Sequence, residues 1–374
     1  MKVKGHKAAL AITVAGLTIL ASVSGAGAAP KPSTDPVAQS LAIAQSYMTA
    51  PTKLGQTIPL RVRPTVGQTV IFANSNNANG ILIAQGMQQA AAAIGWNFDQ
   101  VIYDPANPAS FQAALLTALQ KNPAAVITSG ANTASIGASV TEKFALAKIP
   151  LVMGASCPLV AVPPIFPAGN QCPSELVQGK ILANWFIADS KGKGKLLLQS
   201  MPVYPVLVTF KDALIAEVKL RCAGCTVEVL ETTPAQLSSN QISSVLVNKL
   251  RSDPSLGYLF YDNGAWAKGI VPALDAAGLG GGRIKVGGRG MDEGALGALK
   301  AGTEMAWTAI PYVTLGMTYL DSALRIVTKS SGISKNAVSP TQLVTSVNAG
   351  PIAMPYMAPS NPLELYKKLW LVKK

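Results

Sequence analysis

Four polar residues that follow two predicted strands carry the first chemical signal in the sequence. Asp262 and Asn263 end one short apolar run, and Arg289 and Asp292 follow the next. Arginine binds a carboxylate through two parallel hydrogen bonds, so such a group can recognise an anionic small molecule. For Asp262 and Asp292 the alternative is a role in turns and helix N-caps, which aspartate favours. Arg289 is flanked by glycines and has no obvious capping role, so it is the leading candidate for ligand recognition.

These residues are positioned by two successive strand–helix units at 258–301. Trp266, Ile270 and Leu274 recur at helical spacing after the first strand, and Gly278 suits the end of that helix. Two such units in a row imply parallel strands with helices packed across them. Ligands of open α/β sheets bind beyond the carboxyl ends of the strands, so the four polar residues are expected at a binding site.

The same alternation of strands and helices is predicted in both halves of the chain. The first half predicts strands and helices before a proline-rich loop at 156–174, and the second half resumes after it. The strands are predicted at 69–73, 101–103, 124–128, 149–153, 196–198, 227–230, 259–261, 284–286 and 304–310. The helices are predicted at 35–48, 80–94, 110–120, 135–147, 175–187, 208–218, 239–250 and 313–327. The glycines at 278–282 precede a strand, so they are no dinucleotide fingerprint. The predicted fold is α/β with two doubly wound parallel-sheet lobes.

The first 29 residues are predicted to be a secretory signal peptide. A basic start is followed by an apolar run at 8–21 and by small residues at 24–29. The sequence has no cysteine near the cleavage site, so no lipid anchor is expected, and no later apolar segment has transmembrane length. The mature protein is expected to be exported to the periplasm, the cell envelope or the medium, and to be a monomer.

Composition excludes several kinds of chemistry. His6 is the only histidine and falls in the predicted signal peptide, which excludes Ser-His-Asp catalysis and histidine metal sites in the mature chain. No cofactor or metal is expected. The formal charge is +13, of which Lys2, Lys4 and Lys7 supply three, leaving about +10. No Lys/Arg block with interleaved aromatic residues indicates nucleic-acid binding, so a solvated basic surface accounts for the charge.

Four cysteines in an exported chain predict disulfides. Proximity in the sequence pairs Cys157 with Cys172 and Cys222 with Cys225. The second pair forms CAGC, which is similar to a redox motif. It lies between a predicted helix and a strand, however, and this favours a structural link. A zinc site is disfavoured because no second CxxC accompanies the first.

Three segments in order carry a family resemblance: VIFANSNNANGILIAQGMQQAA at 70–91, FYDNGAWAKGIVPALDAAG at 260–278 and KVGGRG at 285–290. Behind a signal peptide, they resemble the ribose-binding-protein type of periplasmic solute-binding protein over roughly 67–330. The leader and tail look like those of actinobacterial members, most of which carry a lipid anchor. The resemblance implies a type I fold, in which three strands join two lobes that trap a solute. It also implies delivery of that solute to the membrane permease of an ABC importer.

The resemblance also implies the domain boundaries. Lobe 1 is expected at 67–171 plus 312–334, and lobe 2 at 172–311 plus 335–374. A leader at 30–66 with one short helix precedes them. The crossings are expected near Asn170–Ser174, Ile310–Pro311 and Ser330–Val338.

Departures from the sugar-binding members affect the expected pocket. Gly154 stands where the resemblance expects an Asp-Arg pair, and Tyr204 aligns with an arginine. Arg289 replaces an aspartate and Ile310 a glutamine, while Asn263 is kept. The complete set of candidate ligand-binding residues is Asn76, Asn77, Ser129, Gly154, Ser156, Met201, Tyr204, Asn263, Trp266, Arg289, Met291 and Ile310.

Some of these candidates have structural alternatives. Trp266 is expected either to stack on the ligand or to pack in the core, and Met201 and Met291 either line an apolar pocket or fill gaps. Trp96 and Trp185 are expected to pack away from the site.

The leading hypothesis is a binding protein for a small organic acid with an apolar or aromatic body. The first alternative is a sugar or polyol, bound for import or for sensing by a membrane receptor. The second is an exported hydrolase with Asp262 and Asp292 as its acid pair. No acid/base motif surrounds either aspartate, which disfavours the enzyme.

Overall fold

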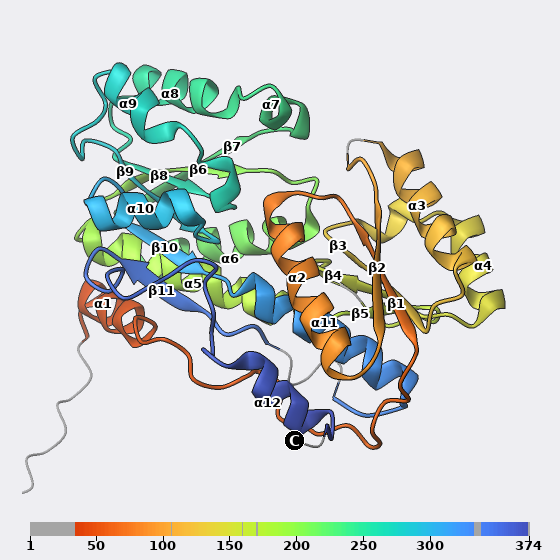
Figure 1. Ribbon diagram of the computed structural model, residues 1–374. Coiled ribbons are helices and arrows are strands. Elements are labelled where there is room, and N and C mark those ends of the chain that lie inside the picture. The colour runs from red at the N-terminus through yellow and green to blue at the C-terminus, as the bar shows by residue number, and fades with distance from the viewer. Residues whose placement is uncertain (1–33, 106, 159, 170, 333–337, 373–374) are drawn as a thin grey trace, which may run out of the picture. The chain divides into compact units, whose positions relative to one another are not determined.

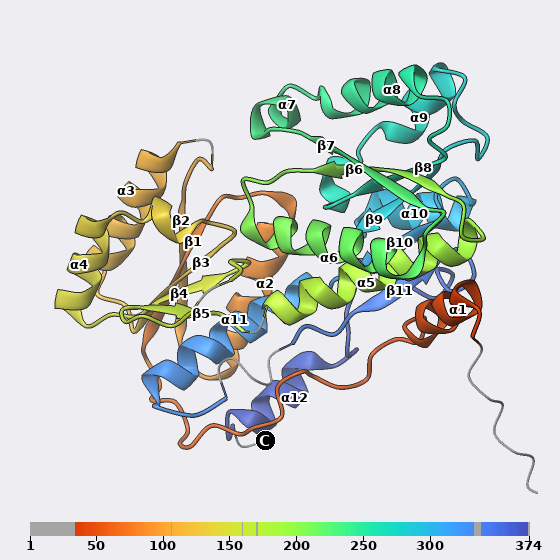
Figure 2. The ribbon, with the colours of Figure 1, turned by 180° about the vertical axis from the view of Figure 1, so that it is seen from behind.

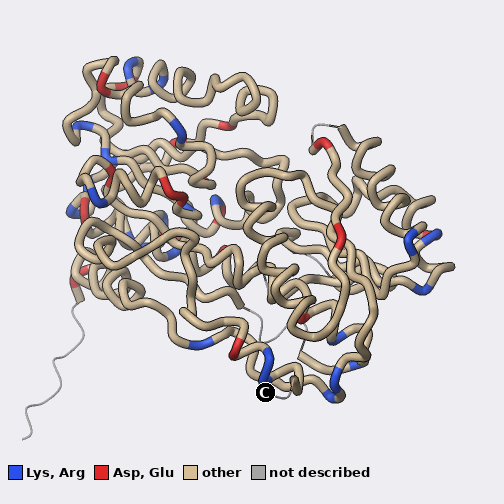
Figure 3. The backbone as a smooth tube through the Cα atoms, viewed as in Figure 1, with Lys and Arg blue, Asp and Glu red and all other residues tan. Residues whose placement is uncertain are grey.

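A computed structural model describes residues 34–105, 107–158, 160–169, 171–332 and 338–372, which form two sheets covered by helices (Figures 1 and 2). The predicted signal peptide, with His6 and the basic start, lies outside the described residues. Lys and Arg are spread along elements of both sheets, with Asp and Glu between them (Figure 3). No helix within the described ranges combines the length and hydropathy needed to cross a membrane.

The first sheet is parallel throughout and has the order β2-β1-β3-β4-β5. Its strands are β1 (Thr69–Asn74), β2 (Asn97–Ile102), β3 (Ala125–Ser129), β4 (Leu151–Gly154) and β5 (Ile165–Pro167). Its helices are α2 (Ala78–Ala93), α3 (Pro108–Gln120), η1 (Thr133–Ser135), α4 (Ala138–Ala147) and α11 (Tyr312–Val327). β5 lies inside the segment predicted as a loop. It was not predicted because this short edge strand has no apolar run in the sequence.

The second sheet has the order β11-β10-β9-β8-β6-β7 and is parallel except for β11. Its strands are β6 (Lys195–Ser200), β7 (Thr226–Glu231), β8 (Tyr258–Tyr261), β9 (Lys285–Arg289), β10 (Ala306–Ala309) and β11 (Gln342–Thr345). Its helices are α5 (Gln171–Asp189), α6 (Pro205–Arg221), α7 (Pro234–Ser238), α8 (Ile242–Ser252), η2 (Gly264–Trp266), α9 (Ile270–Ala276) and α10 (Glu293–Ala301). The two parallel-sheet lobes confirm the predicted fold class.

Alternation along the strands places an apolar layer on each face of each sheet. In β1, Val70 and Phe72 face the layer under α2 and α11, whereas Ile71 and Ala73 face the layer under α3. All four are fully buried, as expected for a central strand covered on both sides, which therefore reads as an unbroken apolar run.

Both disulfides pair as predicted. Cys157 is bonded to Cys172 at the start of α5, and Cys222 to Cys225 between α6 and β7. The second bond lies at a helix-to-strand turn, which is the structural position that the sequence favoured.

More segments pass between the sheets than the three that were predicted. Ile310 and Pro311 connect β10 to α11, while the other two predicted crossings lie partly outside the described residues. In addition, α1 (Pro36–Ser46) packs on α5, yet the leader that follows reaches the first lobe, where the amide of Leu60 donates to the carbonyl of Leu369. The tail after β11 also changes lobes, so leader and tail both link the two.

The placement of the C-terminal helix corrects the predicted boundary of lobe 2. Residues 335–374 were assigned to that lobe, but α12 (Pro362–Leu369) packs on α11 and α2 of the first lobe. Tyr366 and Trp370 are one helical turn apart, so they stack on each other and lie fully buried in that lobe's core. Only β11 and its flanking loop join the second lobe as predicted.

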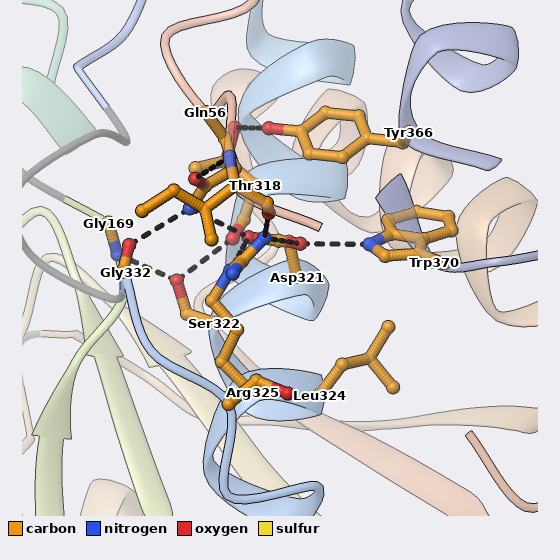
Figure 4. Close-up of polar contacts among 12 residues, drawn as sticks. Gln56, Gly169, Thr318, Asp321, Ser322, Leu324, Arg325, Gly332, Tyr366 and Trp370 are labelled. Atoms are coloured by element: carbon orange, nitrogen blue, oxygen red, sulfur yellow. Dashed lines mark hydrogen bonds and ion pairs between the residues drawn. The ribbon is translucent and has the colours of Figure 1, made fainter. Parts of the chain in front are cut away.

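A buried ion pair on α11 ties these segments together (Figure 4). Arg325 donates to Asp321 at 2.7 Å, and neither side chain is exposed. Trp370 of the tail donates to the same carboxylate at 2.9 Å, and Arg325 donates to the carbonyls of Ile58 and Ser331, both at 2.6 Å. Burial raises the pKa of Asp321, and the guanidinium opposes that rise. Leader, tail and third crossing therefore share one charged anchor.

We expect Asp321→Ala to lower the free energy of unfolding by about 3–5 kcal/mol, because it leaves Arg325 buried without a counter-charge. The control is Asp99→Ala, whose partner Lys121 lies at 2.6 Å with both side chains nearly half exposed. That surface pair is expected to contribute about 0–1 kcal/mol. Urea denaturation measures both, and equal small losses would contradict the anchoring role.

Candidate functional site

A cavity of about 80 Å³ lies where the carboxyl ends of both sheets meet. Its lining comes from both lobes: Asn74, Ser75, Asn77, Asn79, Gly80, Ile83, Ser129, Gly130, Ala155, Tyr204, Val206, Leu207, Asn263, Trp266, Arg289, Tyr312, Leu315 and Tyr319. No group of three or more His, Cys, Asp or Glu residues suited to a metal occurs in the part of the chain that the structure describes.

Half of the predicted site residues line this cavity, namely Asn77, Ser129, Tyr204, Asn263, Trp266 and Arg289. The other six do not: Asn76, Gly154, Ser156, Met201, Met291 and Ile310. Met201, Met291 and Ile310 pack in the cores, because the strand exits turn their side chains away from the cavity. Asn76 is exposed in a left-handed conformation, with φ 53°. Trp96 and Trp185 pack elsewhere, as expected.

Arg289 has an internal carboxylate partner, and this corrects the basis of the organic-acid hypothesis. It donates to Glu175 of α5 through Nε and through Nη2, the latter at 2.6 Å, with both side chains under 10% exposed. Asp292 and Glu293, the nearest acids along the chain, form no ion pair with it in the described part of the structure. Burial opposes the charge of Arg289, but Glu175 outweighs it and raises the arginine pKa. Arg289 therefore keeps its positive charge, and the carboxylate of Glu175 balances that charge within the protein.

The second charged group at the strand ends is turned away from the cavity. Asp262 is fully buried, and its Oδ2 accepts a hydrogen bond from the amide of Met201 at 2.6 Å. Burial raises the pKa of Asp262 to about 7, with that amide and Arg289 opposing the rise. Asp292 caps α10 by accepting from the amide of Ala295 at 2.8 Å, which is the structural role predicted as the alternative. Neither aspartate lines the cavity.

Two asparagines meet across the cavity from opposite lobes. Asn79 of α2 donates through Nδ2 to Oδ1 of Asn263 at 3.3 Å. The same oxygen caps η2 by accepting from the amide of Ala265 at 3.1 Å. Asn77 is more exposed, and its side-chain oxygen caps α2 at Gly80. Asn77 and Asn263 therefore each combine a helix-capping bond with a place at the cavity wall.

Aromatic side chains give the cavity its apolar faces and two donors. Tyr204 and Trp266 lie nearly parallel, with ring centroids 6.2 Å apart and 21° between the planes. Among the described residues, Trp266 Nε1 and Tyr312 Oη are buried and make no hydrogen bond of good geometry. Burial raises the pKa of Tyr312 to about 12, so its hydroxyl keeps its proton. Each nevertheless faces a polar side chain, because hydrogen bonding from Trp266 lowers the pKa of Asp262 and hydrogen bonding with Arg289 lowers that of Tyr312.

Tyr319 explains why Gly154 has no side chain. A Cβ on Gly154 would lie 2.2 Å from the Tyr319 ring, which crosses the end of β4. The Tyr319 hydroxyl lies 3.4 Å from Oγ of Ser129, and burial raises its pKa. Sequence reasoning missed Tyr312, Leu315 and Tyr319, although their i, i+3, i+7 spacing at the start of α11 marks one helix face. That face points to the cavity because α11 begins just after a crossing.

The lining combines hydroxyls, amides and aromatic faces with little free charge. Arg289 is the only ionisable acid or base of the Asp, Glu, Lys, Arg and His types among the described residues that line it, and Glu175 compensates its charge. Such a surface suits a neutral ligand that offers several hydrogen-bonding groups and one flat face.

Comparisons with known proteins agree with this geometry. The model of a family described as periplasmic binding protein domain matches residues 68–331. An ABC sugar transporter subunit from Rhodobacter sphaeroides is 18% identical with a TM-score of 0.62, covering 76% of this chain and 99% of its own. A search of curated proteins gives no match.

Two further solved structures carry bound ligands. A periplasmic solute binding protein of an ABC transporter from Actinobacillus succinogenes, with bound D-allose, is 16% identical with a TM-score of 0.64. It covers 76% of this chain and 99% of its own. A solute binding protein from Bacillus halodurans, with bound myo-inositol, is 19% identical with a TM-score of 0.61, covering 76% and 97% respectively. At these identities the likeness shows the fold.

We expect Arg289→Leu to lower the free energy of unfolding by about 3–5 kcal/mol, because Glu175 then stays buried without its partner. The double variant Arg289→Leu/Glu175→Leu is expected to recover most of that loss, since two apolar side chains need no counter-charge. Urea denaturation of both variants measures the difference. Losses that simply add would contradict the coupling.

Gly154→Ala is expected to destabilise the protein by about 1–3 kcal/mol, because its methyl group displaces the ring of Tyr319. The control is Gly297→Ala in α10, where a Cβ meets no atom within 4 Å. That change is expected to stabilise by about 0.5–1 kcal/mol through helix propensity. Thermal unfolding compares the two, and a neutral Gly154→Ala would show that Tyr319 has room to move.

Proposed function

Since the chain belongs to the periplasmic binding protein family, we propose that it is an exported solute-binding protein that delivers a neutral polyhydroxy solute to an ABC importer. The solute is held between the lobes, and the membrane permease is the partner that receives it. The family is one of binding proteins, so no catalytic step is assigned. In this proposal the protein acts as a monomer and without a lipid anchor.

The observation that carries the proposal is the neutral, hydrogen-bonding character of the cavity. Amide groups of Asn79 and Asn263 and the hydroxyl of Ser129 are matched to the hydroxyls of a polyol, because each both donates and accepts. Tyr312 adds a buried hydroxyl at the cavity wall. The parallel rings of Tyr204 and Trp266 offer a flat apolar face to the carbon skeleton of a sugar ring.

The ligands of similar structures support the same class. D-allose and myo-inositol, bound in the structures described above, are neutral polyols. The described residues that line the cavity include no Asp or Glu, in keeping with the predicted loss of the sugar binders' carboxylates, so hydroxyl recognition is assigned to amides and phenols instead.

The ion pair of Arg289 with Glu175 removes the main support for the organic-acid hypothesis. That hypothesis required Arg289 to present a free cation, but Nε and Nη2 already donate to Glu175, and Nη1 donates to the carbonyl of Asp262 at 3.4 Å. A ligand carboxylate would have to displace Glu175 or share the guanidinium with it, at the cost of placing two buried anions together. We therefore rank the acid below the polyol and include it in the test.

We expect D-allose, D-ribose, D-arabinose or myo-inositol to raise the melting temperature of the mature protein, residues 30–374, by several degrees. At a hundred times the dissociation constant a ligand contributes about 2.7 kcal/mol. Asn263→Ala is expected to abolish the shift, and Asn97→Ala, at an exposed edge-strand position, to preserve it. Differential scanning fluorimetry measures all three proteins.

Benzoate and succinate complete the screen. A shift with either acid, together with none from the polyols, would contradict the proposal and restore the organic-acid hypothesis. A receptor that senses the closed protein, in place of an importer, would leave these binding results unchanged.

A further inference from the structure

A second cavity opens beside the first, between loops of the two lobes. Its volume is about 270 Å³, against about 80 Å³ for the inner one, and it shares Gly130 and Tyr204 with it. We call it the outer chamber. Its lining is Tyr103, Pro105, Asn107, Pro108, Phe111, Gly130, Ala131, Asn132, Ser135, Pro202, Val203, Tyr204 and Pro234.

The outer chamber has a wall of mixed apolar and polar side chains, and it carries no ionic side chain among its described residues. Four prolines from three different loops line it, together with Val203 and the packed pair Tyr103 and Phe111, whose ring centroids are 4.8 Å apart. Rigid prolines and rings offer flat faces with little conformational entropy to lose on binding. The wall therefore suits a ring-shaped apolar group.

Much of the polar surface in the outer chamber is already used within the protein. Asn107 caps α3 by accepting from the amide of Ala109 at 3.0 Å, and Asn132 caps η1 by accepting from Ala134 at 3.0 Å. The hydroxyl of Tyr103 donates to the carbonyl of Ser129 at 3.4 Å, and burial raises its pKa to about 12. A ligand group here gains from apolar contact more than from new hydrogen bonds.

The two adjoining cavities have room for a solute with two parts. The inner cavity offers amides and hydroxyls beside an aromatic face, and the larger outer chamber offers prolines and aromatic rings beside asparagines whose side-chain oxygens already cap helices. Tyr204 borders both and stacks with Trp266 on the inner side. We propose that the solute is a glycoside whose neutral aryl or alkyl group occupies the outer chamber. This inference rests on the proposed function, since the sugar part occupies the inner cavity.

The test compares matched probes by isothermal titration calorimetry. These are the methyl and 4-nitrophenyl β-D-glycosides of glucose, galactose, xylose and ribose, with free myo-inositol as a polyol that lacks an aglycone. For the sugar that binds, the 4-nitrophenyl glycoside is expected to bind at least tenfold more tightly than the methyl glycoside, because the ring leaves water for the outer chamber.

Val203→Asp locates the added affinity. Val203 is 51% exposed in a loop, so the variant is expected to fold. It places a carboxylate beside the aryl group and is expected to weaken the 4-nitrophenyl glycoside at least fivefold while leaving the methyl glycoside within twofold. The control Val347→Asp, at a position that is 85% exposed and outside both cavities, is expected to change neither affinity.

The outcomes separate this inference from the proposed function. Equal affinities for methyl and 4-nitrophenyl glycosides, or an equal effect of Val203→Asp on both, would overturn the two-part ligand while leaving sugar binding intact. Binding of myo-inositol or methyl glycosides with exclusion of every aryl glycoside would do the same. If no probe binds and the polyols of the fluorimetry screen also fail, the proposed function and this inference fall together.

Discussion

The ion pair between Arg289 and Glu175 fixes the floor of the cavity, and the chemistry of the site follows from it. Arg289 ends β9 and Glu175 lies in the second turn of α5, so the pair joins a strand exit to the helix at the first crossing. Glu175 also accepts from Gln178 at 3.2 Å, and Gln178 accepts from Thr308 of β10. A buried pair of this kind is retained only when its hydrogen bonds are satisfied. The network satisfies them without a ligand, and the cavity is left with neutral groups for recognition.

The second buried pair, Asp321 with Arg325, bears on how the lobes are connected. It holds the leader, the tail and the third crossing against α11, whose first turns supply Tyr312 and Tyr319 to the cavity. Closure of two-lobed binding proteins proceeds by hinge bending at the segments that join the lobes. Here the leader and tail add two covalent links to the crossings. The leader and the tail are each held at one end by the Asp321–Arg325 pair on α11. Hinge bending is therefore expected in the extended parts of the leader and tail, away from that pair.

The sequence predicted the periodic parts of this structure and missed what depends on tertiary contacts. Strand and helix positions followed from apolar spacing, and the strand-exit rule located Asn263 and Arg289 at the cavity. The partner of Arg289 could not be found this way, because Glu175 lies 114 residues away and carries no local signal. Tyr319 was missed for the same reason, since its helix enters the site only after the chain has crossed between lobes. The C-terminal helix was assigned to the wrong lobe, because an amphipathic pattern shows which face of a helix is buried but not which element covers it.

The departures from the sugar-binding pattern form one repacked surface. Arg289 stands where the resemblance expects an aspartate, and Glu175 restores the missing negative charge from another element. Gly154 stands where a charged pair is expected, and the Tyr319 ring occupies the space that a side chain there would need. Neither position presents an uncompensated charge to the ligand, because Glu175 neutralises Arg289 and a phenol ring fills the space beside Gly154. Neutral groups lose less hydration free energy when a ligand covers them. For the proposed two-part solute, shape and apolar contact in the proline-lined outer chamber take the place of the contribution that charge makes in the sugar-binding pattern.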